Sequence, residues 1–298
     1  MSQTLTQTAR PLPSMTSPAI HPTPPFDEFI TQRIQFAHPE KTLGTPVVND
    51  DICAALFGID LITYLRIKEQ FAMHAARAAE ELLDDAAFAH QLDQLPFQPN
   101  ETIVAVGDSI TDDLQSWFEI LRHALAMQRP QDNLTLINRA VSGDTSTHLI
   151  TRFLVATQDQ PNWIFCFIGT NDARTHGIQP YKTLVSPQET ARNLQAIRQF
   201  TATQTHAKLI WLTPATVIEQ AIPCDWWLAP HQLMWLNSEM ASMADMVRQQ
   251  PEPVVDLQRV FGMPANPRSL LADGLHPSLE GQKQIVRAVV ERLSQIQH

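Results

Sequence analysis

Glycine is scarce in this chain. Only nine of its 298 residues are glycine, against 22 prolines, whereas average proteins contain roughly 7% glycine and about 5% proline. A collagen-like repeat is therefore excluded. Because glycine adopts positive φ angles with little steric cost, the position of each of the nine is informative.

Basic residues are also in the minority. The chain has 21 lysines and arginines against 31 aspartates and glutamates, which gives a formal net charge of −10. Nucleic acids and anionic membranes attract basic surfaces, so neither is expected as a partner. A solvated acidic face is the simplest interpretation of the excess.

Cysteines are few, and they are far apart in the sequence. Cys53, Cys166 and Cys224 are odd in number and show no spacing typical of a metal site. A disulfide scaffold is therefore not expected, and the sequence implies neither a metal nor another cofactor. The histidines likewise lack the paired spacing of zinc ligands.

Long apolar runs are absent. No stretch approaches 18 apolar residues, the length expected of a membrane-spanning helix. Residues 1–25 contain six prolines and a single arginine and have no apolar run of the kind found in secretory signals. We therefore expect a cytoplasmic protein with no stable membrane insertion.

The pattern of the chain divides it into three parts. Residues 1–25 are rich in Ser, Thr, Gln and Pro, and we expect them to form a disordered tail. Residues 26–98 have apolar side chains at helical spacing and are expected to form a helical extension. Pro96 and Pro99 end that pattern, and residues 99–298 are expected to form the main domain.

The main domain alternates apolar runs with amphipathic segments. The runs predict strands at 102–107, 134–138, 163–169, 208–213 and 253–257. The segments between and after them predict helices near 113–128, 146–157, 187–204, 231–249 and 278–296. Ser186 and Pro187 supply an N-cap and a first-turn proline for the third of these helices. Five strand-then-helix units predict a three-layer α/β/α sandwich with a five-stranded parallel sheet.

Chemically active residues follow these strands. Ser109 follows the first strand, Gly143 the second and Asn171 the third, while Asp273 and His276 lie in a turn before the last helix. Ligands bind beyond the carboxyl ends of parallel strands. Taken singly, each residue is also explained by helix capping or by turn formation.

Together the four blocks resemble the SGNH hydrolases, also called the GDSL esterase and lipase family. The matching segments are GDSI at 107–110, NRAVSGDTS at 138–146, GTND at 169–172 and DGLHPS at 273–278. The resemblance covers about residues 101–296 and implies that family's flavodoxin-like fold. Ile110 and Ala140 depart from the family's usual leucine and glycine, but neither change removes a residue that carries chemistry.

The resemblance implies a role for each matching residue. Ser109 is expected to be the nucleophile, His276 the general base and then acid, and Asp273 the residue that orients the histidine. The backbone N–H groups of Ser109 and Gly143 and the side chain of Asn171 are expected to form the oxyanion hole. With an ordinary histidine pKa of about 6.5, activity is expected to rise through about pH 6 to 7.

Other residues near these blocks have simpler interpretations. Asp108 and Asp172 are expected to brace their loops through hydrogen bonds to nearby groups. Trp226 and Trp227 follow the fourth strand and are expected to line a substrate pocket, whereas packing of the next helix explains Trp235 equally well.

Three functions remain open from the sequence. The first is a serine esterase for small or medium acyl esters, including acetylated sugars. The second uses the same residues as a lysophospholipase or thioesterase for longer acyl chains. The third is a binding or interaction protein that works through the helices of residues 26–95. Because the apolar side chains on one face of these helices need to be buried, a helical cap packed on the sheet domain is the simpler interpretation of that region.

Overall fold

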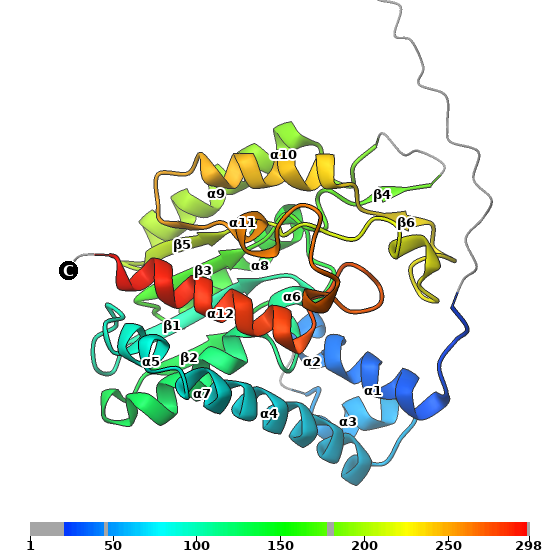
Figure 1. The fold of residues 1–298 in the computed structure, drawn as a ribbon, viewed down its shortest axis with the longest axis horizontal. Helices are drawn as coiled ribbons and strands as arrows, with labels where there is room; N and C mark the ends of the chain where they lie inside the picture. The colour runs from blue at the N-terminus through cyan, green and yellow to red at the C-terminus, as the bar shows by residue number, and fades with distance from the viewer. Residues whose placement is uncertain (1–20, 45–46, 178–181, 297–298) are drawn as a thin grey trace, which may run out of the picture.

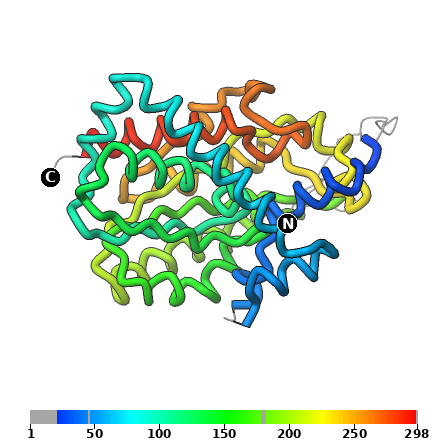
Figure 2. The backbone as a smooth tube through the Cα atoms, turned by 90° about the horizontal axis from the view of Figure 1, so that it is seen from below, coloured from blue at the N-terminus to red at the C-terminus, as the bar shows by residue number. Residues whose placement is uncertain are grey.

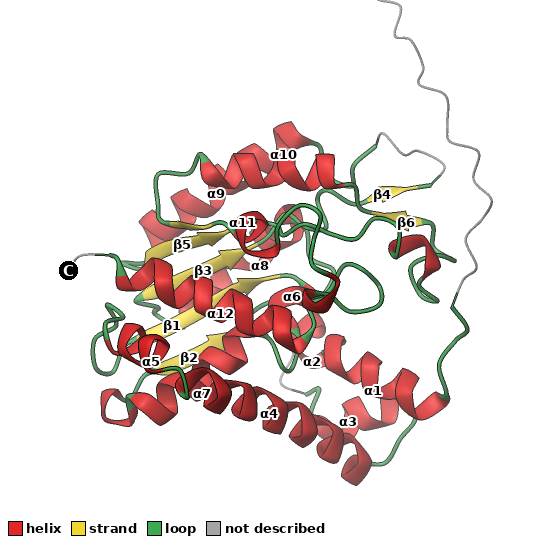
Figure 3. Ribbon diagram, viewed as in Figure 1, coloured by secondary structure: helices red, strands yellow, loops and turns green. Residues whose placement is uncertain are grey.

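The centre of the molecule is a five-stranded parallel sheet with the order β2-β1-β3-β5-β7 (Figures 1 and 3). The computed structural model describes residues 21–44, 47–177 and 182–296. The strands are β1 (Thr102–Gly107), β2 (Thr135–Asn138), β3 (Trp163–Phe167), β5 (Lys208–Leu212) and β7 (Val254–Val255). This is the flavodoxin-like strand order, whose switch point lies between β1 and β3.

Helices cover both faces of this sheet, as Figure 2 shows. Alternate side chains of β1 point to opposite faces: Ile103 and Ala105 join one buried cluster, and Val104 and Val106 join another. The first cluster includes α7 (Trp117–Gln128) and α12 (Leu279–Ser294). The second includes α8 (Ser146–Gln158), α9 (Pro187–Gln204) and α10 (Asn237–Arg248). The expected three-layer sandwich is confirmed.

Several predicted boundaries differ from those in the structure. The helix expected from 113 begins at Trp117, because residues 109–112 form the separate short helix α6 (Ser109–Asp112) and a turn follows it. The helix expected from 231 begins at Asn237. Residues before it form β6 (Leu233–Met234), which pairs antiparallel with β4 (Thr175–His176). The strand expected at 253–257 ends at Val255, and α11 (Leu257–Phe261) follows.

The start of α9 matches its prediction in two respects. Pro187 is the first helical residue, and the Ser186 side chain accepts a hydrogen bond from the Glu189 N–H. The Glu189 side chain pairs with Arg192 on the exposed face of the helix and does not take part in the cap. The sequence therefore predicts the beginning of this helix correctly.

In the described part of the N-terminal region, residues 21–44 and 47–98, the expected helical structure consists of five helices. They are α1 (Phe26–Phe36), α2 (Pro39–Leu43), α3 (Asp50–Leu56), α4 (Leu61–Leu83) and α5 (Ala86–Asp93). The C-terminal half of α4 buries Ala75, Ala79 and Leu82 in the same cluster as α7 and α12. A domain boundary at residue 98 stays a prediction. The predicted tail at 1–25 lies outside the described residues except for residues 21–25.

The first two helices occupy a different place from α4. They lie beyond the carboxyl end of the sheet, beside α6 (Figure 1). There the Leu114 N–H donates to the Gln35 carbonyl over 3.2 Å. Among the described helices, none is both long enough and apolar enough to span a membrane. The N-terminal region therefore reaches both the sheet's hydrophobic core and the edge where the sequence places its chemical residues.

Candidate active site

The serine block forms a tight turn between β1 and α6. Gly107 ends the strand so close to β3 that an added Cβ would lie 2.4 Å from the Phe167 carbonyl oxygen. The Asp108 side chain then caps α6 by accepting the Ile110 N–H over 3.1 Å. Ser109 is the first residue of this helix. Its position at the end of a central strand places its hydroxyl at the carboxyl edge of the sheet.

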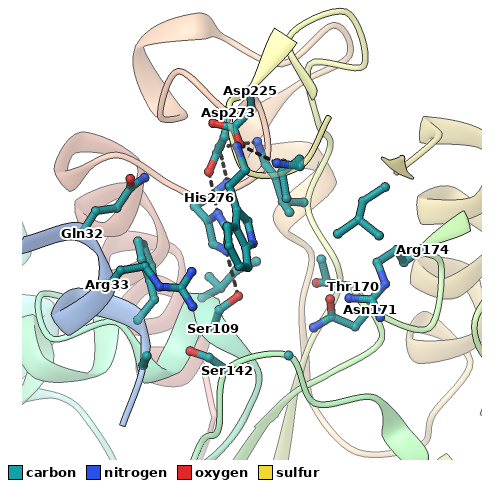
Figure 4. Close-up of a pocket in the computed structure, with 18 of the residues that line it drawn as sticks. Gln32, Arg33, Ser109, Ser142, Thr170, Asn171, Arg174, Asp225, Asp273 and His276 are labelled. Carbon is teal, nitrogen blue, oxygen red and sulfur yellow. Dashed lines mark hydrogen bonds and ion pairs between the residues drawn. The ribbon is translucent and has the colours of Figure 1, made fainter. Parts of the chain in front are cut away.

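Ser109, His276 and Asp273 form a continuous hydrogen-bonded chain (Figure 4). The Ser109 Oγ lies 2.9 Å from His276 Nε2, and His276 Nδ1 lies 2.6 Å from Asp273 Oδ2. Because a carboxylate only accepts hydrogen bonds, Nδ1 carries the proton and Nε2 accepts from the serine. The second Asp273 oxygen accepts the N–H groups of Leu275 and His276. This arrangement suits transfer of the serine proton to the imidazole.

The charges around His276 favour its protonated form. Burial alone would lower the pKa of His276, but the negative charges of Asp273, Asp108 and Asp113 outweigh burial and raise it. For Asp273, burial raises the pKa, but the neighbouring His276 and two backbone N–H groups outweigh this and lower it. The imidazolium that forms during proton transfer is therefore stabilised.

The three expected oxyanion donors face the same cavity. Ser109, Gly143 and Asn171 all line it. Within the described ranges, the N–H groups of Ser109 and Gly143 have no hydrogen-bond acceptor. Gly143 has a φ of +85°, and an added Cβ would meet no atom within 4 Å, so backbone conformation is what requires glycine there. The Asn171 amide donates one hydrogen bond to the Asp144 carbonyl, which leaves its second N–H available.

The cavity has a volume of about 570 Å³, which is within the usual range for small-molecule sites. Trp226 and Trp227 lie in its wall, and their role in a substrate pocket stays a prediction. Trp235 lines the same cavity although it is only 2% exposed, and its Nε1 donates to the Thr170 carbonyl. Packing and cavity lining therefore both apply to Trp235.

An adjoining wall comes from the N-terminal region, which the family resemblance does not reach. Gln32, Arg33 and Phe36 of α1 line the cavity. The Phe36 ring lies 4.7 Å from the His276 ring, measured between centroids. Sequence reasoning missed these residues, because helical periodicity identifies α1 as a helix without showing where it packs.

Polar contacts attach this wall to the loops of the site. The buried Asp112 carboxylate binds His38 over 2.7 Å and Lys41 over 2.5 Å. Its other oxygen accepts both the N–H and the hydroxyl of Ser142, the residue before Gly143. One carboxylate thus connects α2 and its N-cap residue His38 to the loop that carries a proposed oxyanion donor.

The pKa values of Asp112 and Asp113 shift in opposite directions. Burial raises the pKa of Asp112, but the His38 hydrogen bond and the Lys41 charge outweigh it, so the pKa falls to about 2. Asp113 accepts from Gln35 over 3.0 Å, but burial outweighs its hydrogen bonds and raises its pKa to about 6. Asp112 is therefore fully charged at neutral pH.

The remaining carboxylates make contacts inside the protein. Asp108, which caps α6, is fully buried, and burial raises its pKa to about 7. Asp172 accepts from the Ser146 backbone and from the hydroxyls of Ser146 and Thr190. Both sets of contacts agree with the expected bracing role. Over the described part of the chain, no group of three histidine, cysteine or acidic residues is arranged to hold a metal.

Comparison with known proteins identifies matching families and folds. Residues 105–284 match the model of the GDSL-like lipase/acylhydrolase family. LAE5, an α/β hydrolase from the metagenome of Lake Arreo, has a similar fold, with a TM-score of 0.53 and 22% identity, covering 68% of this chain and 99% of its own. A catalytic mutant of Axe2, an acetylxylan esterase from Geobacillus stearothermophilus, has a TM-score of 0.51 and 20% identity, covering 66% and 95% respectively.

A curated protein matches over a shorter stretch. Thioesterase 1/protease 1/lysophospholipase L1 of Escherichia coli K12 is 27% identical over 97 residues, which is 32% of this chain. That stretch is 46% of the relative, so the match spans about half of that protein's length.

Proposed function

Because this chain belongs to the GDSL-like lipase/acylhydrolase family, we propose that it is a serine esterase that hydrolyses small or medium acyl esters through an acyl-enzyme. In this proposal Ser109 is the nucleophile, His276 transfers the proton and Asp273 orients the histidine. The observation that carries the proposal is the 2.9 Å contact between Ser109 Oγ and His276 Nε2, with Asp273 on the far side of the ring.

The first half of the reaction forms the acyl-enzyme. The Ser109 oxygen attacks the ester carbonyl carbon while His276 Nε2 takes the hydroxyl proton. The resulting oxyanion accepts hydrogen bonds from Ser109 N–H, Gly143 N–H and the Asn171 amide. His276 then gives its proton to the alcohol oxygen as the bond between that oxygen and the acyl carbon breaks.

The second half releases the acid. Water gives a proton to His276 and attacks the acyl carbon, and the same donors stabilise the second tetrahedral intermediate. Breaking the bond to Ser109 returns the proton to the serine and frees the carboxylic acid. Removal of one oxyanion donor typically lowers kcat by about a hundredfold to a thousandfold.

The cavity wall supports binding of an acyl group. Tryptophan, phenylalanine and leucine side chains from α1 and from residues 226–235 line much of it. Such a surface binds an acyl chain through burial of apolar area. The Axe2 relative, an acetylxylan esterase, supports short acyl groups, acetylated sugars included.

A second candidate is hydrolysis of longer acyl chains or acyl thioesters. The same apolar wall and the E. coli relative, a thioesterase and lysophospholipase, favour it. We measure kcat/KM on 4-nitrophenyl esters of two to sixteen carbons, together with acyl-CoA. Preference for acyl chains beyond about ten carbons, or for the thioester, replaces the short-acyl proposal with this one.

The third candidate, a binding protein acting through residues 26–95, gains no support from the packing of these helices. The apolar stripe of α4 covers α7, and α1 lines the cavity. A helical cap explains both contacts.

Labelling with a fluorophosphonate probe tests the nucleophile. The wild-type protein is expected to be labelled and the Ser109→Ala variant is not. Ser142→Ala is a matched control, because Ser142 lines the same cavity but has no histidine contact. Equal labelling of the wild type and Ser109→Ala ends the serine-hydrolase proposal.

A further inference from the structure

Two arginines line the cavity from different elements. Arg33 comes from α1, and Arg174 precedes β4. Figure 4 shows them on opposite sides of Ser109 and His276. The cavity that contains Ser109 is therefore lined by two arginine side chains.

Neither arginine has an acidic partner among the described residues. Within those ranges, no carboxylate lies within 4.0 Å of either guanidinium, whereas Arg152, close to the same loops, is paired with Asp144. The Nε of Arg174 is buried without any hydrogen-bond acceptor in the described structure. Burial lowers the pKa of both arginines, and no neighbouring carboxylate opposes that shift. Arginine nevertheless remains charged in proteins, so these are two unneutralised positive charges.

Tryptophans hold both side chains in place. The Arg33 Cζ lies 4.3 Å from the Trp227 ring centroid, and the Arg174 Cζ lies 6.0 Å from the Trp235 ring centroid. A cation–π contact uses the face of a guanidinium and leaves its N–H groups in the plane free. Those groups suit bidentate binding of a carboxylate or a phosphate.

Neither of the two carboxylates that line the cavity pairs with these arginines in the described structure. Asp273 binds His276, and Asp225 accepts the N–H groups of Trp227 and Leu228 over 2.9 and 2.8 Å. An unpaired buried charge costs free energy that a bound counter-charge recovers. We therefore expect the substrate to supply the negative charge that pairs with the arginines.

We infer that the cavity selects esters that carry a carboxylate or phosphate beyond the scissile bond, and that Arg33 and Arg174 bind this anionic group. The inference rests on the proposed esterase function and narrows its substrate class. Arg33 lies outside the residues that match the family model, so the N-terminal region contributes directly to specificity.

Matched substrate pairs test the inference. One pair is 4-nitrophenyl butyrate and mono-4-nitrophenyl succinate, which differ by a carboxylate on the acyl side. The other is glycerol monoacetate and its 3-phosphate, which differ by a phosphate on the alcohol side and are followed by acid release. A charge-assisted contact is worth about 1.5–3 kcal/mol, so the anionic member of at least one pair is expected to have a kcat/KM about tenfold to a hundredfold higher. Which pair shows the preference distinguishes the two kinds of anion.

Arginine variants link any preference to these side chains. Arg33→Met and Arg174→Met are expected to lower kcat/KM for the preferred anionic ester at least tenfold more than for its neutral partner, and Arg33→Lys to keep part of the preference. Arg66→Met is the control, since Arg66 is exposed on α4 and does not line the cavity; it is expected to change neither substrate. Thermal denaturation establishes that each variant is folded.

The outcomes separate this inference from the proposed function. If both members of each pair are hydrolysed equally, the anion preference is overturned and the proposed esterase function stands. The same holds if the arginine variants lose kcat/KM equally on neutral and anionic esters. Hydrolysis of none of the four esters, or hydrolysis that survives Ser109→Ala, instead overturns the esterase on which the inference rests.

Discussion

The N-terminal region attaches to the rest of the molecule in two chemically different ways. The C-terminal half of α4 packs on α7 through buried alanines and Leu82, and its polar contacts, such as Glu81 with Lys283, are exposed. In contrast, α1 and α2 meet the site through Gln35, His38 and Lys41, which bind two buried carboxylates. Apolar burial is non-directional, whereas hydrogen bonds fix geometry. The first attachment therefore contributes mainly stability, and the second also positions the site.

The largest effect is expected for Asp112→Ala. Removing one partner of a buried ion pair typically costs about 3–5 kcal/mol of unfolding free energy. The variant also frees the Ser142 N–H from its anchor, and misplacing a reacting group by about 1 Å can cost about a hundredfold in rate. Chemical denaturation and kcat/KM measure the two losses.

A charge pair elsewhere in the same region serves as the control. Lys68 and Asp50 form a partly exposed pair between α4 and α3, and exposed pairs contribute about 0–1 kcal/mol. Asp50→Ala is expected to change neither stability nor kcat/KM appreciably. If Asp112→Ala loses stability but keeps full activity, the polar attachment does not position the site.

Leu82→Ala tests the apolar attachment. Leu82 is 1% exposed in the cluster shared with α7, and truncation of a buried leucine costs about 2–5 kcal/mol. Because no residue of α4 lines the cavity, kcat/KM of the folded variant is expected to stay within about twofold of the wild type. If the fully folded variant also loses activity, the apolar attachment positions the site as well, and the two attachments do not differ in this respect.

Phe36→Ala tests how much α1 contributes to catalysis through its contact with His276. An aromatic contact is worth about 0.5–1.5 kcal/mol beyond area burial, so loss of the ring beside His276 is expected to lower kcat/KM about threefold to tenfold. Phe57→Ala is matched to it, because the Phe57 ring packs on Tyr64 away from the cavity. Steady-state kinetics are expected to give a lower kcat/KM for Phe36→Ala than for Phe57→Ala. Equal kcat/KM values would show that the Phe36 ring does not contribute to catalysis.

The smallest effect is expected in the pH profile. Burial opposes protonation of His276, but Asp273, Asp108 and Asp113 raise its pKa above 6.5, so half-maximal kcat/KM on the acid side should fall above the pH expected from the sequence alone. The base must be neutral, so activity rises as pH passes this pKa. Asp113→Asn removes one of the three negative charges and should move the acid limb to lower pH. An unchanged limb, or one that moves to higher pH, contradicts the influence of Asp113.

The sequence predicts the sheet well because its central strands β1, β3 and β5 are short apolar runs that are mostly buried. It places the start of α10 too early, at residue 231, because Leu233 and Met234 pair with a strand far away in the sequence. The apolar run at 253–257 is also cut short, because Asp256 begins the turn into α11. Long-range pairing and local capping override periodicity in these two places.

The site is predictable only in part, for a related reason. Ser109, Gly143, Asn171 and His276 lie within motifs that follow strands, so their meeting at one edge follows from the topology. The places of Phe36 and His38 depend instead on contacts with residues far along the chain, such as the one between His38 and Asp112. No periodicity within α1 contains that information.

The contact between Phe36 and His276 also bears on how the protein folds. It joins the first described helix to the turn before the last one, so the cavity closes only after nearly the whole chain has assembled. Closing such a long loop is entropically costly and tends to come late. During refolding, hydrolytic activity is therefore expected to return after the burial of the sheet's tryptophans, which makes turnover a reporter of complete assembly.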